Sequence, residues 1–464
     1  MSKTEVVIDD KTYVADEGSL LIDLLIKNDL KVPYFCYHEA LGADGNCRMC
    51  MVEIEGQKRP QIACDTLVKE GMVVRTKGKN IENVRQNILE LELINHPVDC
   101  PVCDQAGECK LQDFYMEYGL YDSHIDKSEK VHFEKHIDLG GNVMLDQERC
   151  VLCARCTRFT SDITKTNELG IVGRGDHAHI ATMPGKKLDN PYAMNVVDLC
   201  PVGALTSKDF RFSQRVWFLK TTPSACHGCA KACSIHIDHN REKYKEERIY
   251  RFRPRENPDV NGFFICDEGR LSYKALQENR QRERIVDGKP ISEKEALLAY
   301  AELVESTKGK VVVLADPNLY LEELLMIQSY ARSLGASLHA PLASYLDDSF
   351  GDDWLKSSQR AANAKGVEKL GISTELPEDE DIALLIDFNH QDAASIEAKQ
   401  TISFRTHRRE GEAALVLPLA VFSESEGTLL NEDGIEQYCA KAIEPEKTVR
   451  SAIDWIGKFE GGAV

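Results

Sequence analysis

The spacing of cysteines constrains this chain more than any other feature of its sequence. All but one of its 16 cysteines fall into four groups within the first 266 of its 464 residues. The groups are Cys36, Cys47, Cys50 and Cys64; Cys100, Cys103 and Cys109; Cys150, Cys153, Cys156 and Cys200; and Cys226, Cys229, Cys233 and Cys266. Thiolates gathered in this way are typical of iron–sulfur ligand sets, and a chain with four such sets is most simply a conduit for electrons.

Other features of the sequence argue against disulfide bonds between these cysteines. The first 18 residues carry charges and no long apolar run, so we expect no signal peptide. No stretch approaches about 18 uninterrupted apolar residues, so we expect no membrane span. A reducing cytoplasm is the default compartment, and there repeated C-x2-C spacing indicates metal ligation rather than disulfides. The net charge of −19 disfavours a nucleic-acid partner, because phosphates need a basic face.

The first group is predicted to hold a two-iron cluster in a β-grasp domain. Short β-rich runs at 4–8 and 12–15 predict a hairpin, and Ser19 can cap a helix that follows. The spacing C-x10-C-x2-C-x13-C resembles that of plant-type two-iron ferredoxins, with a longer first gap. Gly42 and Gly45 lie in the loop, where backbone amides must turn toward the sulfurs. A four-cysteine zinc site is the alternative, but zinc knuckles usually pair two C-x2-C units.

The second group has three cysteines and a histidine in place of a fourth. Ile81, Val84, Ile88 and Leu91 recur at helical spacing and predict an amphipathic helix over 81–95, which ends before Pro97. His96 then precedes Cys100, Cys103 and Cys109 with the spacing H-x3-C-x2-C-x5-C. A lone histidine at a helix end is more often a partner of the helix dipole. Beside a triplet that lacks one ligand, it predicts a four-iron site with mixed ligation.

The third group follows the bacterial ferredoxin pattern. The run RCVLCARCTRF supplies Cys150, Cys153 and Cys156, and a remote C-P pair supplies Cys200. This arrangement predicts a four-iron site. The segment GIVGRGD at 170–176 lacks the G-x-G-x-x-G order of a nucleotide-binding loop, so we expect a turn there. The neighbouring His177 and His179 are expected to be surface or sheet residues rather than ligands.

The fourth group leads to a recognisable family. Cys226, Cys229, Cys233 and Cys266 have the spacing C-x2-C-x3-C-x32-C and resemble the four-iron site of molybdopterin oxidoreductases. The order of all four groups over residues 1–275 resembles the large iron–sulfur subunit of respiratory complex I, the NADH:quinone oxidoreductase. The resemblance implies one 2Fe-2S cluster on the first group and three 4Fe-4S clusters on the others. Since some family members lack the fourth site, its presence suggests a bacterial form.

A different kind of sequence begins near residue 276. The apolar runs KGKVVVLADP (308–317) and DIALLIDFN (381–389) predict buried parallel strands, and the pattern EKEALLAYAELVEST (293–307) predicts a helix between strands. The segment from 412 to 437 resembles one that closes the substrate domain of molybdopterin enzymes. We expect this α/β domain to be shortened and to bind no molybdopterin, since it has no cysteine where a metal ligand would stand. Cys439 is expected to be a small buried hydrophobe.

The fold expected from these patterns is an α+β multidomain chain. Its predicted parts are a β-grasp domain at 1–79, a helical module with the histidine and three cysteines of the second group at 80–119, a ferredoxin-like four-iron module at 140–218, a four-cysteine domain at 219–275 and a shortened α/β domain at 276–464. The resemblance implies partners on either side of an electron relay, namely a flavin- and NADH-binding subunit and a smaller iron–sulfur subunit. It also implies a peripheral place on the cytoplasmic side of the bacterial inner membrane, reached only through partner subunits.

Two other functions are weighed against this one. The first three groups also occur in the iron–sulfur subunits of soluble NAD-linked hydrogenases and formate dehydrogenases. A formate enzyme would need a pterin domain with a metal-ligating cysteine, and an iron-only hydrogenase would need further cysteines after Cys266. The other alternative is a structural protein stabilised by zinc. The histidine in the second group and the C-P pair of the third group argue against it.

Overall fold

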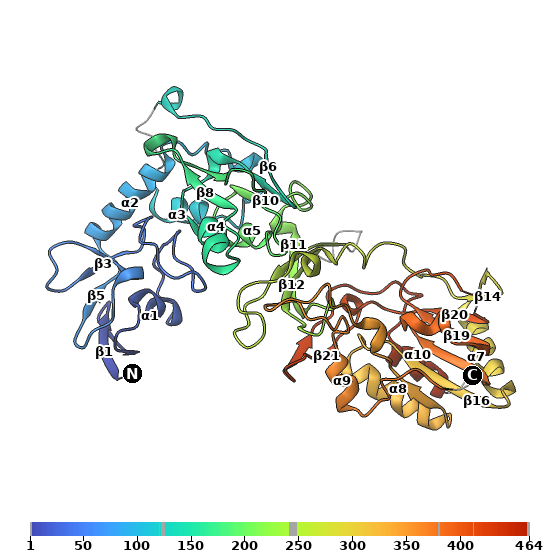
Figure 1. Cartoon of the computed structure of the whole chain (residues 1–464). Coiled ribbons are helices and arrows are strands. Elements are labelled where there is room, and N and C mark those ends of the chain that lie inside the picture. The colour runs from blue at the N-terminus through green and yellow to red at the C-terminus, as the bar shows by residue number, and fades with distance from the viewer. Residues whose placement is uncertain are drawn as a thin grey trace. The chain divides into compact units, whose positions relative to one another are not determined.

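The computed structural model describes residues 2–119, 121, 126–240, 248–378, 381–411 and 413–461. The chain divides into two compact units, Met1–Trp217 and Phe218–Val464 (Figure 1). The first unit carries three of the four cysteine groups, and the second carries the fourth. Both units mix helices with strands, so the chain is a mixed α/β multidomain protein.

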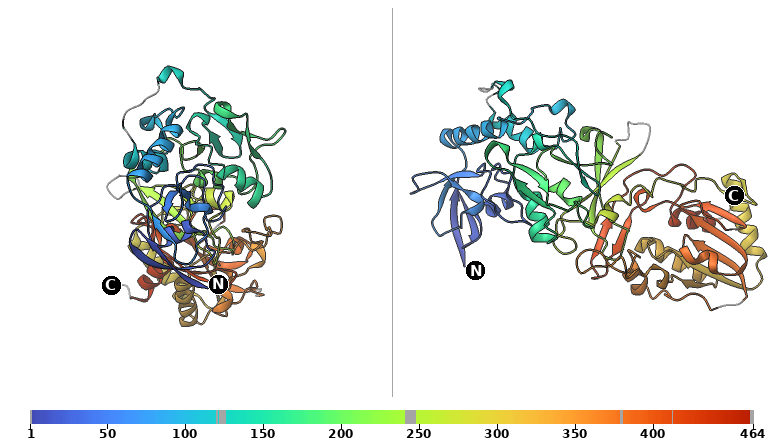
Figure 2. Two further views of the ribbon diagram at one scale, coloured as in Figure 1. Left: turned by 90° about the vertical axis from the view of Figure 1, so that its left-hand side faces the viewer. Right: turned by 45° about the horizontal axis from the view of Figure 1, so that its top comes forward.

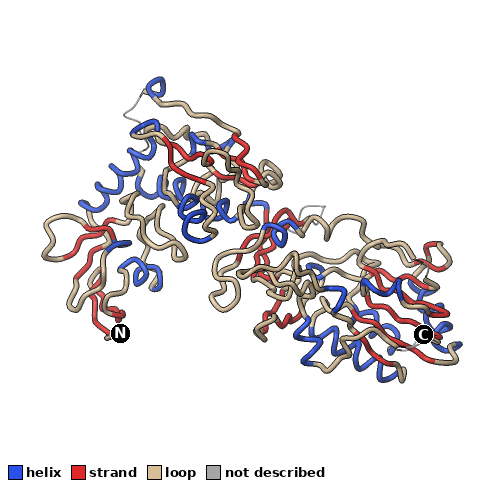
Figure 3. The backbone as a smooth tube through the Cα atoms, in the orientation of Figure 1, coloured by secondary structure: helices blue, strands red, loops and turns tan. Residues whose placement is uncertain are grey.

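A five-stranded sheet opens the first unit. Its order is β2-β1-β5-β3-β4, built from β1 (Lys3–Ile8), β2 (Lys11–Asp16), β3 (Met51–Ile54), β4 (Gln61–Ile62) and β5 (Val73–Arg75). The predicted hairpin is confirmed, since β1 and β2 pair antiparallel across Asp9 and Asp10, which both adopt the left-handed conformation. Most of the chain between helix α1 (Leu21–Lys27) and β3 is loop (Figure 3).

The predicted cap of α1 is wrong. Leu20 occupies the N-cap position without a side-chain hydrogen bond. The Ser19 hydroxyl instead donates to the Asp16 carbonyl at 2.7 Å, which closes the turn before the helix. Burial of Leu21, Ile22, Leu24 and Leu25 therefore holds this short helix on the sheet.

Helix α2 (Lys79–Leu93) confirms the predicted helix but not its predicted face. Leu91 is 66% exposed, whereas Ile81, Arg85 and Leu89 are buried. The side chain of Arg85 takes the inner position because its guanidinium donates to the Met51 carbonyl at 3.1 Å and to the Tyr118 hydroxyl at 3.3 Å. The spacing of apolar residues in the helix could not predict these two hydrogen-bond acceptors.

The remaining elements of the first unit are short. They are α3 (Lys110–Tyr118), α4 (Arg155–Arg158) and α5 (Asn195–Leu199), a sheet of β10 (Leu205–Ser207), β7 (Val143–Leu145) and β6 (Ile137–Gly140), and a hairpin of β8 (Leu169–Val172) and β9 (His179–Thr182). The turn predicted in GIVGRGD is confirmed for 173–176, where Gly173 and Gly175 have φ of 73° and 59°, whereas 170–172 belong to β8. His177 lies in that turn and His179 begins β9.

The second unit begins with an antiparallel sheet and continues as an α/β layer. The first sheet pairs β11 (Leu219–Ala225), β12 (Ser234–Asn240) and β13 (Ile249–Pro254), and helix α6 (Asp267–Leu271) follows it. The larger sheet has the order β15-β14-β20-β19-β18-β16-β17, and its strands are β14 (Ile285–Val286), β15 (Lys289–Pro290), β16 (Lys310–Ala315), β17 (Ser337–His339), β18 (Ile382–Phe388), β19 (Ala398–Arg405) and β20 (Leu415–Pro418).

The predicted parallel strands are confirmed. β16 pairs parallel with β17 and β18, and β18 and β20 both pair parallel with β19. The other elements are α7 (Glu293–Ser306), α8 (Leu321–Ser333), α9 (Ala364–Lys369), α10 (Ala452–Glu460) and a hairpin of β21 (Gly427–Leu430) and β22 (Glu436–Cys439). Figure 2 gives two further views of the two units.

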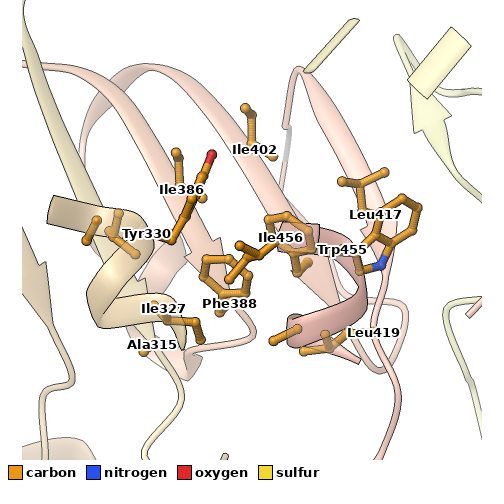
Figure 4. Packing of buried hydrophobic residues seen from close by; sticks show 14 of the residues in the cluster. Ala315, Ile327, Tyr330, Ile386, Phe388, Ile402, Leu417, Leu419, Trp455 and Ile456 are labelled. Carbon is orange, nitrogen blue, oxygen red and sulfur yellow. The ribbon is translucent and has the colours of Figure 1, made fainter. Parts of the chain in front are cut away.

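One hydrophobic core holds the α/β layer together. Residues of α7, α8 and α10 pack with alternate residues of the sheet, such as Ile386 and Phe388 of β18. Figure 4 shows Trp455 and Ile456 of α10 facing this sheet. Ile382 and Leu385 of β18 pack in a smaller cluster, and all seven residues of the strand are buried. This accounts for the continuous apolar run of the strand.

No helix in the described ranges is long and apolar enough to cross a membrane.

Candidate iron–sulfur sites

The first predicted ligand set lies in the long loop between α1 and β3 and in the turn after β4. Its members, Cys36, Cys47, Cys50 and Cys64, are all buried. Hydrogen bonds from Cys47 and Cys64 hold the pKa of the Cys36 thiol well below its usual range. A hydrogen bond from Cys64 likewise lowers the pKa of Cys50. These couplings link all four sulfurs in one group.

The backbone around this group turns amides toward sulfur. The Phe35 amide donates to the Cys47 Sγ at 3.4 Å. Gly42, Gly45 and Arg48 adopt the left-handed conformation. A Cβ on Gly45 would also lie 3.2 Å from the Ile62 side chain. Both the backbone conformation and the limited space therefore favour glycine at this position. Amide donors of this kind stabilise the negative charge of a cluster.

The second predicted set begins where α2 ends. His96 follows the helix, and its Nδ1 atom is buried with no hydrogen-bond partner among the described residues. Burial lowers the pKa of His96 to about 4, so the imidazole is neutral at pH 7. A neutral imidazole with an unpartnered nitrogen is the form that binds metals. Val98, which follows Pro97, has φ of 48°, a rare conformation for a β-branched residue.

The three cysteines of this set lie close to the third set. Cys100 begins a short 3-10 turn, and Cys109 occupies the N-cap position of α3. Burial raises the pKa of Cys109 to about 12. A Cβ on Gly203, three residues after Cys200, would lie 2.4 Å from the Cys103 Sγ. Only glycine therefore fits at 203. The described contacts do not join His96 to these thiols directly, so their joint ligation remains a prediction.

The third predicted set lines one cavity. Cys150, Cys153, Cys156 and Cys200 all face it, with Val151 and Leu205 among the apolar residues of the lining. Burial raises the pKa of each of the four thiols, that of Cys153 to about 12. Four thiols in such a place resist losing their protons unless cations balance the charge, as iron would. The Leu152 amide donates to the Cys150 Sγ at 3.3 Å.

The fourth predicted set lines a second cavity. Cys226, Cys229, Cys233 and Cys266 face it together. The amides of Gly228 and Gly269 donate to the sulfurs of Cys226 and Cys266 at 3.4 Å and 3.3 Å. A Cβ on Gly269 would lie 3.0 Å and 3.2 Å from these two sulfurs, so the glycine allows close approach. The four residues thus fit a buried cluster with amide donors around it.

The cysteine outside the four groups has a plain structural role. Cys439 is fully buried at the end of β22 and packs in a small apolar cluster with Ala225 and Tyr320, as expected. In the described part of the chain, no three or more His, Cys, Asp or Glu side chains are arranged to hold a single metal ion. The ligand assignments therefore stay predictions.

Sequence reasoning missed three arginines near these sets. Arg149, Arg155 and Arg158 stand within or beside the third cysteine run. Arg149 forms a two-pronged ion pair with Asp99, at 3.1 Å and 2.7 Å, between the second and third sets. Arg155 and Arg158 donate to carbonyls of the first loop. The only available signal was basic side chains placed between closely spaced thiolates.

Four domain families match the chain in succession. They are the 2Fe-2S iron–sulfur cluster binding domain at 2–79, the NADH-ubiquinone oxidoreductase-G iron–sulfur binding region at 85–124, the ferredoxin-like domain of NADH-quinone oxidoreductase subunit 3 at 140–206, and the Fe4S4 domain of molybdopterin oxidoreductases at 219–278.

Curated relatives extend the match beyond these domains. The G subunit of NADH-quinone oxidoreductase from Streptomyces coelicolor is 35% identical over 336 residues, which are 70% of this chain and 39% of the relative. The G subunit from Rickettsia conorii is 33% identical over 84% of this chain and 56% of the relative. The mitochondrial 78 kDa subunit of NADH-ubiquinone oxidoreductase from Neurospora crassa is 36% identical over 75% of this chain and 48% of that protein. The chain thus spans about half the length of these relatives.

A solved structure, that of a NAD+-reducing NiFe hydrogenase in the H2-reduced state, matches 46% of this chain and 91% of its own at 27% identity, with a TM-score of 0.42. The curated relatives and the four successive domains agree with each other. Over the residues that these matches span, the chain is similar to the G subunits of NADH-quinone oxidoreductase and to the mitochondrial 78 kDa subunit.

Proposed function

We propose that this chain is the electron-relaying iron–sulfur subunit of an NADH:quinone oxidoreductase. In this proposal the 16 predicted ligands, 15 cysteines and His96, hold one two-iron and three four-iron clusters. A partner subunit takes the hydride from NADH on a flavin. A smaller iron–sulfur subunit receives the electrons and passes them on to quinone in the membrane. The chain itself holds no NADH site and sits at the cytoplasmic face of the bacterial membrane through its partners.

The contacts among the first three cysteine groups support this proposal best. Arg158 donates to the Cys36 carbonyl, which joins the first group to the third. The Lys110 amide, directly after Cys109, donates at 2.9 Å to the carbonyl of Pro201, directly after Cys200. Electrons cross short gaps between centres, so groups joined this closely suit a relay from the first group through the third to the second.

The fourth group and the α/β layer have other roles in this proposal. The fourth group belongs to a different compact unit from the first three. This supports a place off the main route, where a cluster stabilises the fold. The α/β layer over 276–464 supplies surface for partner subunits. The five domains predicted from the sequence, with their boundaries, are part of the same proposal.

A substitution in the third group tests the relay. Cys153→Ser in the assembled complex should remove one four-iron signal and abolish NADH:quinone turnover. Reduction of ferricyanide by the flavin-bearing partner should continue, because that reaction needs no passage through this chain. Cys439→Ser, in the apolar cluster of the second unit, is the control and should leave both activities unchanged. Normal quinone reduction in a complex that has lost the third cluster would refute the proposed route.

A further inference from the structure

One buried arginine joins two of the predicted cluster sites. Arg155 stands between Cys153 and Cys156 and is only 3% exposed. Its Nη1 atom donates to the Leu199 carbonyl at 3.1 Å, and its Nη2 atom donates to the Tyr37 carbonyl. Leu199 directly precedes Cys200, and Tyr37 directly follows Cys36. A single guanidinium therefore connects the peptide next to a ligand of the first set with the peptide next to a ligand of the third.

The charge of this arginine lacks a carboxylate partner among the described residues. Its guanidinium lies 5.9 Å from the centre of the Tyr34 ring, and its Nε atom is buried without a hydrogen bond. Burying an unpaired charge is costly, so a compensating negative charge is required nearby. Burial lowers the pKa of the Arg155 guanidinium, and the charges of three predicted ligands, Cys153, Cys200 and Cys36, oppose this shift. These three residues belong to the two predicted sites that the arginine joins.

Arg158 provides a comparison within the same helix. It donates to the Leu41 and Gly42 carbonyls at 3.0 Å and 3.1 Å and to the Cys36 carbonyl. All three acceptors lie in the loop of the first set, and Arg158 is less buried than Arg155. Both positively charged side chains thus donate to carbonyls of the first loop, but only Arg155 also donates to the carbonyl of the residue before Cys200.

We infer that Arg155 is a positioning residue that holds the first loop against the third ligand set and sets the reduction potentials of both clusters together. This inference rests on the proposed relay. A fixed positive charge stabilises the more negative, reduced form of each cluster. Because the same charge faces both sites, it raises both potentials in parallel and preserves the driving force between them. The step that it serves moves one electron from the first site to the third and breaks no covalent bond.

The test compares Arg155→Gln and Arg158→Gln in the anaerobically purified full chain. Redox titration followed by low-temperature EPR gives the potentials of the two-iron cluster and the third-set cluster. In R155Q the equilibrium constant for reduction of each of the two clusters should fall about tenfold, which is about 59 mV for one electron. In R158Q the equilibrium constant for reduction of the two-iron cluster should fall, while that of the third-set cluster should change less than twofold. If both equilibrium constants for reduction in R155Q lie within twofold of their wild-type values, the inference is overturned.

Hydrogen exchange separates positioning from charge. In R155Q, amides of both 35–47 and 195–203 should exchange faster, whereas in R158Q only those of 35–47 should do so. If R155Q does not incorporate iron, Arg155→Lys decides, since it keeps the charge but not the two-pronged contact. Faster exchange in both loops of R155K with potentials near wild type supports the inference, and unchanged exchange overturns it. A wild-type chain without iron would instead refute the proposed function.

Discussion

At the scale of single residues, the predicted sites combine buried sulfur with backbone that few side chains tolerate. Gly203 lies so close to the Cys103 sulfur that no Cβ fits, and Gly269 packs against two sulfurs of the fourth set. His96 offers a neutral ring whose buried Nδ1 has no partner among the described residues. Each feature is costly or unusual in an ordinary core, and each fits the clusters that we propose at these places.

His96 allows a direct test at this scale. His96→Ala should remove the four-iron signal of the second set and leave the two-iron signal intact. His96→Cys should restore the cluster with an added negative charge, and we expect its reduction equilibrium to fall at least tenfold by EPR-monitored titration. His177→Ala, in an exposed turn, is the matched control. A second-set signal that survives unchanged in His96→Ala would exclude His96 as a ligand.

At the scale of elements, strand β12 depends on one buried carboxylate. Asp238 is 1% exposed and accepts hydrogen bonds from Arg251 and Arg253 of β13, both at 2.7 Å, and from Thr221 of β11 at 2.7 Å. Burial alone would raise the pKa of Asp238, but the hydrogen bond from Arg253 and the charges of both arginines hold it well below its usual range. This residue ties three strands together.

Asp238→Asn should therefore loosen this sheet. Removing one partner of a buried ion pair costs about 3 kcal/mol, so amide exchange in β11–β13 at pH 7 should quicken by about two orders of magnitude. Because folding lowers the pKa of this carboxyl, its contribution is present above about pH 4 and is lost as the pH falls below that. Asp16→Asn, which removes an exposed pair with Lys3, is the control. Equal exchange in wild type and Asp238→Asn would show that the pair adds no stability.

Local patterns predicted several elements correctly. The hairpin of β1 and β2, helix α7 and the buried strands β16 and β18 follow from short-range periodicity. The inward turn of Arg85 in α2 could not be predicted, because its acceptors Met51 and Tyr118 lie more than 30 residues away in the sequence. The cysteine groups were visible for the opposite reason, since most ligands of each set lie close together along the chain.

At the scale of the whole molecule, the chain separates into a unit with three predicted clusters and a unit with one. The contacts of Arg155 and Arg158, which reach 116 to 122 residues along the chain, unite the first unit around the proposed route. No local pattern could have predicted contacts of this length. In the second unit, the cavity lined by the four cysteines of the fourth set is also lined by residues of α6 and by Phe350, Leu355 and Arg360.

This division predicts separate consequences for the two units. Cys229→Ser should remove the four-iron signal of the fourth set, while the assembled complex keeps most of its NADH:quinone turnover. Cys153→Ser, in the first unit, should abolish that turnover and provides the comparison. Turnover measured on complexes of matched subunit content decides the matter. Complete loss of turnover in an assembled Cys229→Ser complex would place the fourth cluster on the electron route.

The most direct test of the account is the iron and acid-labile sulfide content of the anaerobically purified chain, with low-temperature EPR after reduction by dithionite. One two-iron and three four-iron clusters predict about 14 iron atoms per chain, with distinct two-iron and four-iron signals. A colourless protein that holds about four zinc atoms and gives no EPR signal would contradict the account and leave a structural scaffold in its place.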